Sequence, residues 1–490
     1  MDDDGVQADG HDRGDEVEPV GDEVELVIVA NRLPVTWSNR NGWVRAPGGL
    51  VTALDGIAQR RALTWVGHAS PNGPPGLPAP WRHGRLRSID IEPTVSREAI
   101  DGLANSALWP ALHGLGAHVR WRSGWWDSYV EYNRQVAATL TASLPADSLV
   151  WVHDHQLMLL PALLRDVDPQ RRVGVSIHTP FDLAGVEALP AAEDLATGLA
   201  AANCIGAQTD ADRDAVAAFI RSAAAEEPTG AQVFTSPTSI DAPSMRALLD
   251  DPITIALAER ERRATAGRTL ILTVDRLDYT KGILERMQAY DLAFRKGWIT
   301  PDEVRIVQVT RPTRSALPDY RELRIATERL AHELTTRWVR ADGSSPFESI
   351  IESIDRRRVA ALLSLADVFL VTPARDGMNL VAKEFSILNE PHGGSLVLSR
   401  GAGASHALAT GSIIVDDVQP ASIAMALHRA TQVPPWDRMR LARKRADAVR
   451  AWTSVDWAEA FVERLVENAR PEPPVEPSPA RVSPVPTGLA

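Results

Sequence analysis

Short apolar runs alternate with stretches of helical pattern along nearly the whole of this 490-residue chain. A turn-rich run at 236–241 divides the apolar runs into two sets. Short apolar strands separated by helical spacers are typical of parallel sheets that helices cover on both faces. The sequence therefore predicts an α/β fold with two doubly wound, Rossmann-like domains. The predicted strands lie at residues 26–30, 149–152, 173–177 and 204–207 in the first half and at 270–274, 304–309, 368–371, 396–398 and 413–415 in the second.

The size and charge of the chain exclude several classes of protein. Its length is enough for two or three domains, each with its own core. The net charge is −12, but the first 25 residues hold eleven acids and one arginine and account for −10 of it. We therefore expect no nucleic-acid binding, because the rest of the chain has no basic stripe. No apolar run approaches the roughly 18 residues that a membrane span needs.

The lone cysteine and the N-terminus predict the compartment. Cys204 is the single cysteine, so the chain cannot form an internal disulfide, and a reducing cytoplasm is expected. The N-terminus shows no positive region followed by an apolar stretch, so no signal peptide is predicted. Nothing in the sequence decides whether the protein forms a homo-oligomer.

Composition sets the expected domain limits. Residues 1–22 are rich in Asp, Glu and Gly, and residues 469–490 are rich in Pro, so both tails are expected to be disordered. Between them we expect an N-terminal domain at 23–240 and a C-terminal domain at 241–448. The helical pattern at 449–468 is expected to pack back onto the N-terminal domain and tie the two together.

The segment 367–384, DVFLVTPARDGMNLVAKE, has the pattern of a ligand site. An apolar strand is followed by a polar loop that holds Asp376 and Gly377, and a helix is expected from Met378. Open α/β sheets bind ligands at such strand ends, and the N–H groups of a helix N-terminus favour phosphate. Asp376 can accept hydrogen bonds from sugar hydroxyls, and Glu384 can hold a ribose diol. The alternative is a buried strand, a turn and an amphipathic helix with no ligand.

A second strand end carries positive charge. The apolar run 270–274 is followed by Arg276 and Lys281, two cations separated by a turn. Arginine offers a planar fork and lysine a compact point charge, a pair suited to a diphosphate. The alternative is a surface ion-pair cluster with Asp275 and Asp278. Two strand ends with complementary chemistry, about a hundred residues apart, are hard to explain as coincidence.

Specific motifs at these two strand ends resemble a known family. RLDYTKG (276–282) and DGMNLVAKE (376–384) are similar to motifs of the trehalose-6-phosphate synthase family of retaining, nucleotide-sugar glycosyltransferases. The resemblance covers roughly residues 24–466 and implies the GT-B fold, two Rossmann-like domains facing across a cleft. Further matches, in family order, are ANRLPV (30–35), PGGLVTAL (47–54), NSALWP (105–110), WVHD (151–154), IHTPF (177–181), IGAQT (205–209) and LVLS (396–399).

The resemblance implies the reaction. Glucose would pass from UDP-glucose, or GDP-glucose, to glucose 6-phosphate, giving α,α-trehalose 6-phosphate with retention at the anomeric carbon. Front-face attack, in which the departing phosphate accepts the proton, needs no pair of acid and base carboxylates. Arg276 and Lys281 would neutralise the leaving diphosphate. Asp376 and His178 would hold the transferred sugar, and Glu384 the ribose.

The resemblance also assigns binding residues. Arg32 and Arg314 would bind the acceptor phosphate, Trp109 would wall the acceptor site, and Asp154 would line it. We expect no metal and no cofactor, because no His, Asp or Glu cluster has ligand spacing. The partners would be small-molecule substrates. Besides Arg276, Lys281 and Asp376, the donor site would use Gly48, Gly49, Gly377, Met378, Asn379, Leu380, Val381, Ala382, Lys383 and Glu384.

Departures from the family pattern cluster on the acceptor side. Ile100 stands where a tyrosine usually helps to hold the acceptor phosphate, and isoleucine cannot donate a hydrogen bond. The usual HIPFP reads HTPFD at 178–182, the usual HDYHL reads HDHQL at 153–157, and Ser239 replaces a common glycine. A second hypothesis therefore keeps the donor and changes the phosphorylated acceptor, as in glucosylglycerol-phosphate synthases or pseudo-glycosyltransferases. A third is a non-catalytic sugar-phosphate sensor, which the intact Arg276 and Lys281 argue against.

Overall fold

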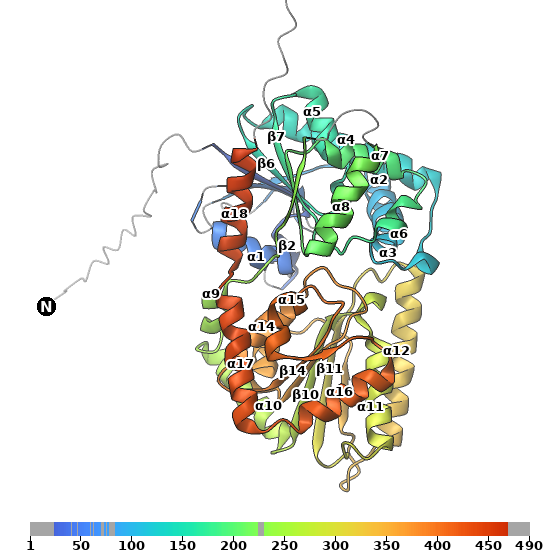
Figure 1. Ribbon diagram of the computed structural model, residues 1–490, viewed down its shortest axis with the longest axis vertical. Coiled ribbons are helices and arrows are strands. Elements are labelled where there is room, and N and C mark those ends of the chain that lie inside the picture. The colour runs from blue at the N-terminus through green and yellow to red at the C-terminus, as the bar shows by residue number, and fades with distance from the viewer. Residues whose placement is uncertain are drawn as a thin grey trace, which may run out of the picture.

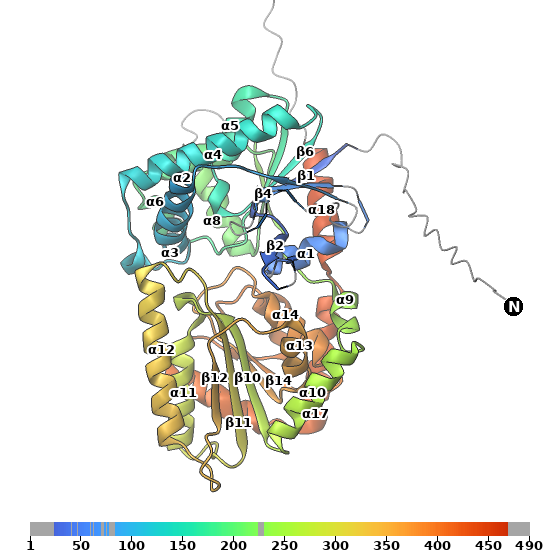
Figure 2. The same ribbon diagram turned by 180° about the vertical axis from the view of Figure 1, so that it is seen from behind.

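The computed structural model describes residues 24–468 apart from 41, 47, 59, 62, 70–72, 75, 78–83 and 224–229. The two tails whose disorder the sequence predicts lie outside the described residues. Two α/β domains are stacked end to end, with the N-terminal domain above the C-terminal domain in Figure 1 and in the opposite view of Figure 2. No helix within the described part of the chain has the length and apolar character needed to cross a membrane.

The N-terminal domain is built on a seven-stranded parallel sheet with the order β5-β4-β1-β6-β7-β8-β9. Its strands are β1 (Leu26–Arg32), β4 (Leu63–His68), β5 (Arg85–Ser88), β6 (Leu149–His153), β7 (Arg172–Ser176), β8 (Cys204–Ala207) and β9 (Gln232–Thr235). A hairpin of β2 (Val35–Ser38) and β3 (Gly42–Arg45) follows β1. Its helices are α1 (Gly49–Ala58), α2 (Pro93–Arg97), the π-helix η1 (Glu98–Leu108), α3 (Trp109–Leu112), η2 (Gly116–His118), α4 (Ser123–Ser143), η3 (His155–Leu157), α5 (Leu160–Val167), α6 (Leu183–Glu187), α7 (Ala192–Ala200) and α8 (Asp210–Ala223).

The C-terminal domain is built on a six-stranded parallel sheet with the order β12-β11-β10-β13-β14-β15. Its strands are β10 (Thr269–Arg276), β11 (Val304–Arg311), β12 (Phe347–Ile350), β13 (Val368–Val371), β14 (Ser395–Ser399) and β15 (Ile413–Val415). The helices that follow the interdomain linker are α9 (Ala242–Ala247), α10 (Pro252–Thr265), η4 (Tyr279–Lys281), α11 (Ile283–Arg295), α12 (Pro318–Arg337), α13 (Arg356–Leu365), α14 (Leu380–Leu388), α15 (Ser405–Leu408), η5 (Ala409–Gly411), α16 (Pro420–Thr431), α17 (Pro435–Arg450) and α18 (Ser454–Glu467).

Both faces of each sheet are buried, which is why its inner strands are continuous apolar runs. In β1, Val27 and Val29 belong to the hydrophobic core on one face of the sheet. Leu26 and Ile28 belong to the core on the other face. β10 divides its residues between two cores in the same way. The predicted α/β class is confirmed, and all nine predicted strands are present.

Helix α18 leaves the C-terminal domain and packs on the N-terminal one, against α1 (Figure 1). Its side chains Trp457 and Phe461 are fully buried. The Phe461 ring stacks on Trp151 of β6 with the centroids 4.3 Å apart, and the Trp457 ring lies 5.0 Å from the same indole. The last helix of the C-terminal half therefore completes one of the two cores of the N-terminal domain.

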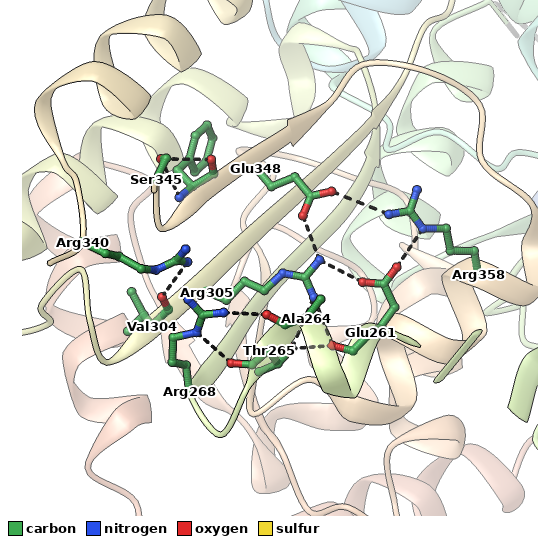
Figure 3. A network of polar contacts seen from close by, with 11 residues as sticks. Glu261, Ala264, Thr265, Arg268, Val304, Arg305, Arg340, Ser345, Glu348 and Arg358 are labelled. Carbon is green, nitrogen blue, oxygen red and sulfur yellow. Dashed lines mark hydrogen bonds and ion pairs between the residues drawn. The ribbon is translucent and has the colours of Figure 1, made fainter. Parts of the chain in front are cut away.

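A polar network fixes the amino end of the C-terminal sheet (Figure 3). Arg305, the second residue of β11, lies 2.9 Å from Glu261 of α10 and 2.8 Å from Glu348 of β12. Arg358 of α13 contacts Glu261 at 3.0 Å. Arg305 is buried, so its charge needs these two carboxylates. The network ties four elements together at the end of the sheet that faces away from the N-terminal domain.

Candidate active site

Side chains from the carboxyl ends of both sheets meet between the two domains. Arg32 is the last residue of β1, and His178 follows β7. Arg276 is the last residue of β10, and its guanidinium lies 5.1 Å from the ring of Trp109 in the N-terminal domain. Residues at the carboxyl ends of strands in both domains therefore lie together, where open α/β sheets bind ligands.

Lys281 and Asp376 form the centre of this site. The Lys281 amine donates to Oδ2 of Asp376 at 2.6 Å, and the Asn379 amide donates to the same oxygen at 3.0 Å. Burial alone would raise the pKa of the Asp376 carboxyl, but the charge of Lys281 and these two hydrogen bonds hold the pKa below its usual value. Asp376 is therefore an ionised acceptor beside a fixed ammonium group.

Arg276 and Arg314 share Asp278 and the face of Trp109. Arg314 lies 2.9 Å from Oδ2 of Asp278, and Arg276 lies 3.7 Å from the same oxygen. Burial would raise the pKa of Asp278, but Arg314, Arg276 and Lys281 lower it to about 2. The guanidinium of Arg314 covers the Trp109 ring at 4.0 Å from its centroid. The backbone of Arg314 has φ of 47°, a strained conformation for a side chain of this size.

The ion pairs at this strand end are internal and not on the surface, although Asp278 does pair with Arg276 at 3.7 Å. Asp275 pairs with the buried Arg286 at 2.7 Å and not with Arg276 or Lys281. Asp278 is itself fully buried. The two acids are therefore internal supports for the loop.

Asp154 and His178 support each other across the ends of β6 and β7. The Asp154 carboxylate accepts hydrogen bonds from the backbone N–H groups of His178 at 3.1 Å and Thr179 at 3.4 Å. The two nitrogens of the His178 ring lie 3.0 Å from the His153 ring and 3.2 Å from the Thr238 hydroxyl. Burial lowers the pKa of His178, so the ring is neutral. Asp154 acts here by shaping the loop, and the His178 ring is oriented from both sides.

Two glycines allow backbone from the two domains to approach closely. A Cβ atom on Gly377 would lie 1.9 Å from the carbonyl oxygen of His178, so no larger residue fits there. A Cβ atom on Gly49, at the start of α1, would lie 2.9 Å from Cδ1 of Leu380, at the start of α14. The N-termini of α1 and α14, one from each domain, therefore lie together, where their N–H groups favour an anion. Gly48 directly precedes Gly49 in the same loop.

Residues 378–384 divide between the interface and the interior. Asn379 caps α14, its side chain accepting from the backbone N–H of Ala382 at 3.3 Å. Glu384 is partly exposed, and burial raises its pKa to about 7 against the opposing charges of Arg356 and Arg45. The side chains of Met378 and Ala382 are buried, and those of Leu380 and Val381 are half-buried.

The side chain of Lys383 contacts the interdomain linker, and its place in the donor site stays a prediction. Its amine donates to the carbonyl oxygen of Thr238, in the interdomain linker, at 2.8 Å. Its side chain is buried, and burial lowers its pKa to about 7. The side chain of Lys383 therefore ties α14 to the linker, so that a contact with a donor would have to use its backbone.

The structure adds residues that the sequence did not single out. His113 of the N-terminal domain is buried, with Nδ1 2.7 Å from the carbonyl oxygen of Trp109 and Nε2 without a partner. Burial lowers its pKa to about 4, so the ring is neutral. Arg375 lies 2.5 Å from Asp182 of the other domain. Arg311 ends β11 directly beside Arg276. The places of Arg311 and Arg375 at or after strands could have pointed to them, whereas His113 follows helix α3 and had no such signal.

The described residues contain no group of three or more His, Cys, Asp or Glu side chains that could hold a metal ion. The expectation of a reaction without a resident metal or cofactor stays a prediction, since it came from ligand spacing in the sequence.

Two facing Rossmann-like domains, with cations and helix N-termini where they meet, define the GT-B class of glycosyltransferases. The chain belongs to glycosyltransferase family 20, whose model matches residues 24–467. This match confirms the resemblance drawn from the sequence motifs.

Similar proteins and structures carry consistent names. The trehalose-6-phosphate synthase of Mycobacterium avium (strain 104) is 31% identical over 507 residues, covering 94% of this chain and 99% of that protein. An alpha,alpha-trehalose-phosphate synthase (UDP-forming) from Burkholderia xenovorans, in complex with glucose-6-phosphate, has a TM-score of 0.82 at 28% identity, covering 90% of this chain and 100% of that one. A structure from E. coli bound with UDP-2-fluoro glucose has a TM-score of 0.81 at 27% identity, covering 90% and 98%.

Proposed function

We propose that this protein transfers glucose from UDP-glucose to glucose 6-phosphate with retention, giving α,α-trehalose 6-phosphate and UDP. The observation that carries the proposal is the pair of cations, Arg276 and Lys281, beside the N-terminus of α14 and the ionised Asp376. The names of the relatives support it, as do the glucose-6-phosphate and the UDP-sugar analogue in two similar structures. The names of these relatives and structures also favour UDP over GDP as the nucleotide of the donor.

The residues at the interface divide the work of this reaction. The anomeric hydroxyl of the acceptor forms a bond to C1 of glucose while the bond from C1 to the diphosphate oxygen breaks. The departing diphosphate takes the hydroxyl proton and holds the bonding electron pair, so negative charge develops on it. Arg276, Lys281 and the N–H groups of α14 stabilise that charge. Asp376 and His178 hold the transferred glucose, and Glu384 holds the ribose.

The acceptor binds between the domains, against the wall made by Trp109. Arg32 and Arg314 face this side, and Asp154 shapes the loop that closes it. An acceptor held here needs no side-chain base, because the leaving group removes its proton. The chain's own contribution is to position the two sugars and to supply fixed positive charge.

A second candidate keeps UDP-glucose and replaces glucose 6-phosphate by another phosphorylated acceptor. Ile100 is the observation that favours it, because this residue offers no hydrogen bond to a phosphate. The HTPFD sequence at 178–182, which departs from the family pattern, gives this second candidate less support. Asp182 caps α6 through Gly185 at 2.8 Å and pairs with Arg375, so its role is to join the domains.

The test is an acceptor panel. Purified protein is incubated with UDP-glucose and glucose 6-phosphate, glucose, glycerol 3-phosphate or no acceptor, and released UDP is measured. We expect UDP release with glucose 6-phosphate, and a product whose NMR spectrum shows the symmetric α,α linkage. Release only with glycerol 3-phosphate would replace the proposal by the second candidate. No release with any acceptor would favour a sensor.

A further inference from the structure

Arg311 is the last residue of β11 and lies at the carboxyl end of the C-terminal sheet, which faces the N-terminal domain. In the parallel pairing of β10 with β11, Arg311 lies directly opposite Arg276. Residues paired in this way project from the same face of a sheet, so the two guanidinium groups start side by side. Arg311 is half-buried, and so is Arg276.

Arg32, at the end of β1 in the other domain, belongs to the same group of charges. Burial lowers the pKa of Arg311, and the positive charges of Arg276 and Arg32 lower it further. Arg32 also contributes to lowering the pKa of His68, after burial. Arg276 lies opposite Arg311 in the sheet, and Arg32 of the other domain lies near enough for its charge to act on Arg311.

The arginines elsewhere in this fold show what is missing at Arg311. Arg305 lies six residues earlier on the same strand and face, and two carboxylates bind it (Figure 3). Arg314 is held by Asp278 at 2.9 Å and by the Tyr320 hydroxyl at 2.6 Å. Within the part of the chain that the structure describes, neither Arg311 nor Arg32 has an ion-pair or side-chain hydrogen-bond partner. Arg276 has one carboxylate, Asp278, at 3.7 Å.

An uncompensated group of like charges at a half-buried place is relieved by an anion. The donor diphosphate has Arg276, Lys281 and the helix N-terminus of α14. Arg311 and Arg32 instead lie beside Arg276 on the side of the Trp109 wall, where the acceptor is proposed to bind. A phosphate monoester suits them, because each guanidinium fork can bind two of its oxygens.

We propose that Arg311 binds the phosphate of the acceptor together with Arg32 and sets the preference for a phosphorylated sugar. This inference rests on the proposed function, since it assumes transfer to an acceptor that carries phosphate. It also explains how the site works with Ile100, which has no donor, and with an Arg314 that is already bonded twice. Arg311 supplies a hydrogen bond to the phosphate that neither Ile100 nor Arg314 has free.

The test compares Arg311→Gln with the unchanged protein by steady-state kinetics. The KM for glucose 6-phosphate is expected to rise roughly 10- to 100-fold, as when a charged hydrogen bond is lost. The KM for UDP-glucose and the slow rate with unphosphorylated glucose should not change. Inorganic phosphate, used as a competitor of the acceptor, should lose affinity by a similar factor. Arg311→Lys should keep part of the affinity, because it keeps the charge.

Arg329→Gln is the matched control, because Arg329 is 81% exposed on α12 and its ion-pair partner among the described residues is Glu333 of the same helix. An unchanged KM for the phosphorylated acceptor in Arg311→Gln would overturn the inference while leaving the proposed function standing. An equal loss with glucose and with glucose 6-phosphate would also overturn it, since the effect would not concern phosphate. If the panel reveals a different phosphorylated acceptor, the same measurements are made with that compound. If only an unphosphorylated acceptor works, both proposals are overturned.

Discussion

The Lys281 amine lies 2.6 Å from Oδ2 of Asp376, so the cation proposed to meet the leaving group is held by a carboxylate before any substrate binds. Lys281 follows β10 and Asp376 follows β13, two adjacent strands of the C-terminal sheet. Both side chains are largely buried, at 7% and 14% exposure. The contact therefore fixes the position of the ammonium group and also contributes to the fold.

Removing the leaving-group cations should stop turnover. We expect Arg276→Ala and Lys281→Ala each to reduce kcat by about 100- to 1,000-fold, because charge on the departing diphosphate loses a fixed partner. UDP release under saturating substrates measures the effect, and circular dichroism checks that the variants are folded. Near-normal product formation by both variants would exclude the proposed role.

Variants of Lys281 and Asp376 should change the stability and the activity of the protein separately. Asp376→Ala leaves a buried ammonium without a partner and should lower the free energy of unfolding by about 3 kcal/mol. The double variant Lys281→Met/Asp376→Leu removes both charges and should regain most of that stability while staying inactive. Urea unfolding of the unchanged protein, Lys281→Met, Asp376→Leu and the double variant measures the cycle. A double variant as unstable as the sum of the single variants would show that the two groups do not interact.

Gly377 should tolerate no side chain. Gly377→Ala places a Cβ atom 1.9 Å from the His178 carbonyl oxygen, so the loop and the neighbouring domain must separate. A displacement of about 1 Å at the reacting groups costs on the order of 100-fold in rate, and we expect at least that loss in kcat/KM. Gly124→Ala is the control, because a Cβ atom there meets nothing within 4 Å. Equal activity of the two variants would contradict the close approach.

Donor binding should release a proton near neutral pH. The pKa of Glu384 is raised to about 7 by burial, with Arg356 and Arg45 opposing. Ribose hydroxyls donate to the ionised carboxylate, so UDP binding favours loss of the proton, and affinity for UDP should fall as pH drops from 8 to 6. Calorimetry in buffers of different ionisation enthalpy measures the released proton, which should be absent in Glu384→Gln.

The same shift has a consequence for stability. Because the pKa in the folded state lies above the ordinary value of 4.5, the contribution of Glu384 to stability is complete below about 4.5 and is lost as pH rises through about 7. Glu384→Gln should therefore be more stable than the unchanged protein at pH 8 and no more stable at pH 4.5. Thermal unfolding at the two pH values tests this, and an equal difference at both would contradict the raised pKa.

The sequence was sufficient to predict the α/β class and nine strands of the two sheets, and apolar runs marked the strand ends that carry Arg276, Lys281 and Asp376. The roles of Arg32, Trp109 and Arg314 came from the family resemblance. The sequence did not predict β4, β5, β9, β12 or the hairpin of β2 and β3. In β5 the residues Arg85, Arg87 and Ser88 are exposed, and a polar edge strand of this kind contains no apolar run. Arg311 was missed for a related reason. The predicted strand ended at 309, whereas pairing with β10 extends β11 through Thr310 and Arg311.

No local sequence pattern predicted the contacts between the two domains. The approach of Gly377 to His178 and the pair of Arg375 with Asp182 join segments about two hundred residues apart. Both depend on how the finished domains meet. The resemblance assigned Lys383 to the donor site with its whole motif, and only the packing of α14 against the linker shows where that amine lies.

Helix α18 has a consequence for how the protein is made. The indole of Trp151 lies under Trp457 and Phe461, which are among the last described residues to leave the ribosome. Until then the apolar side chains of β6 and α1 that α18 covers are exposed to solvent in the nascent first domain. Transiently exposed apolar surfaces of this kind promote aggregation. The first half therefore completes this core only after α18 has been synthesised, so the two halves reach their native state as one unit.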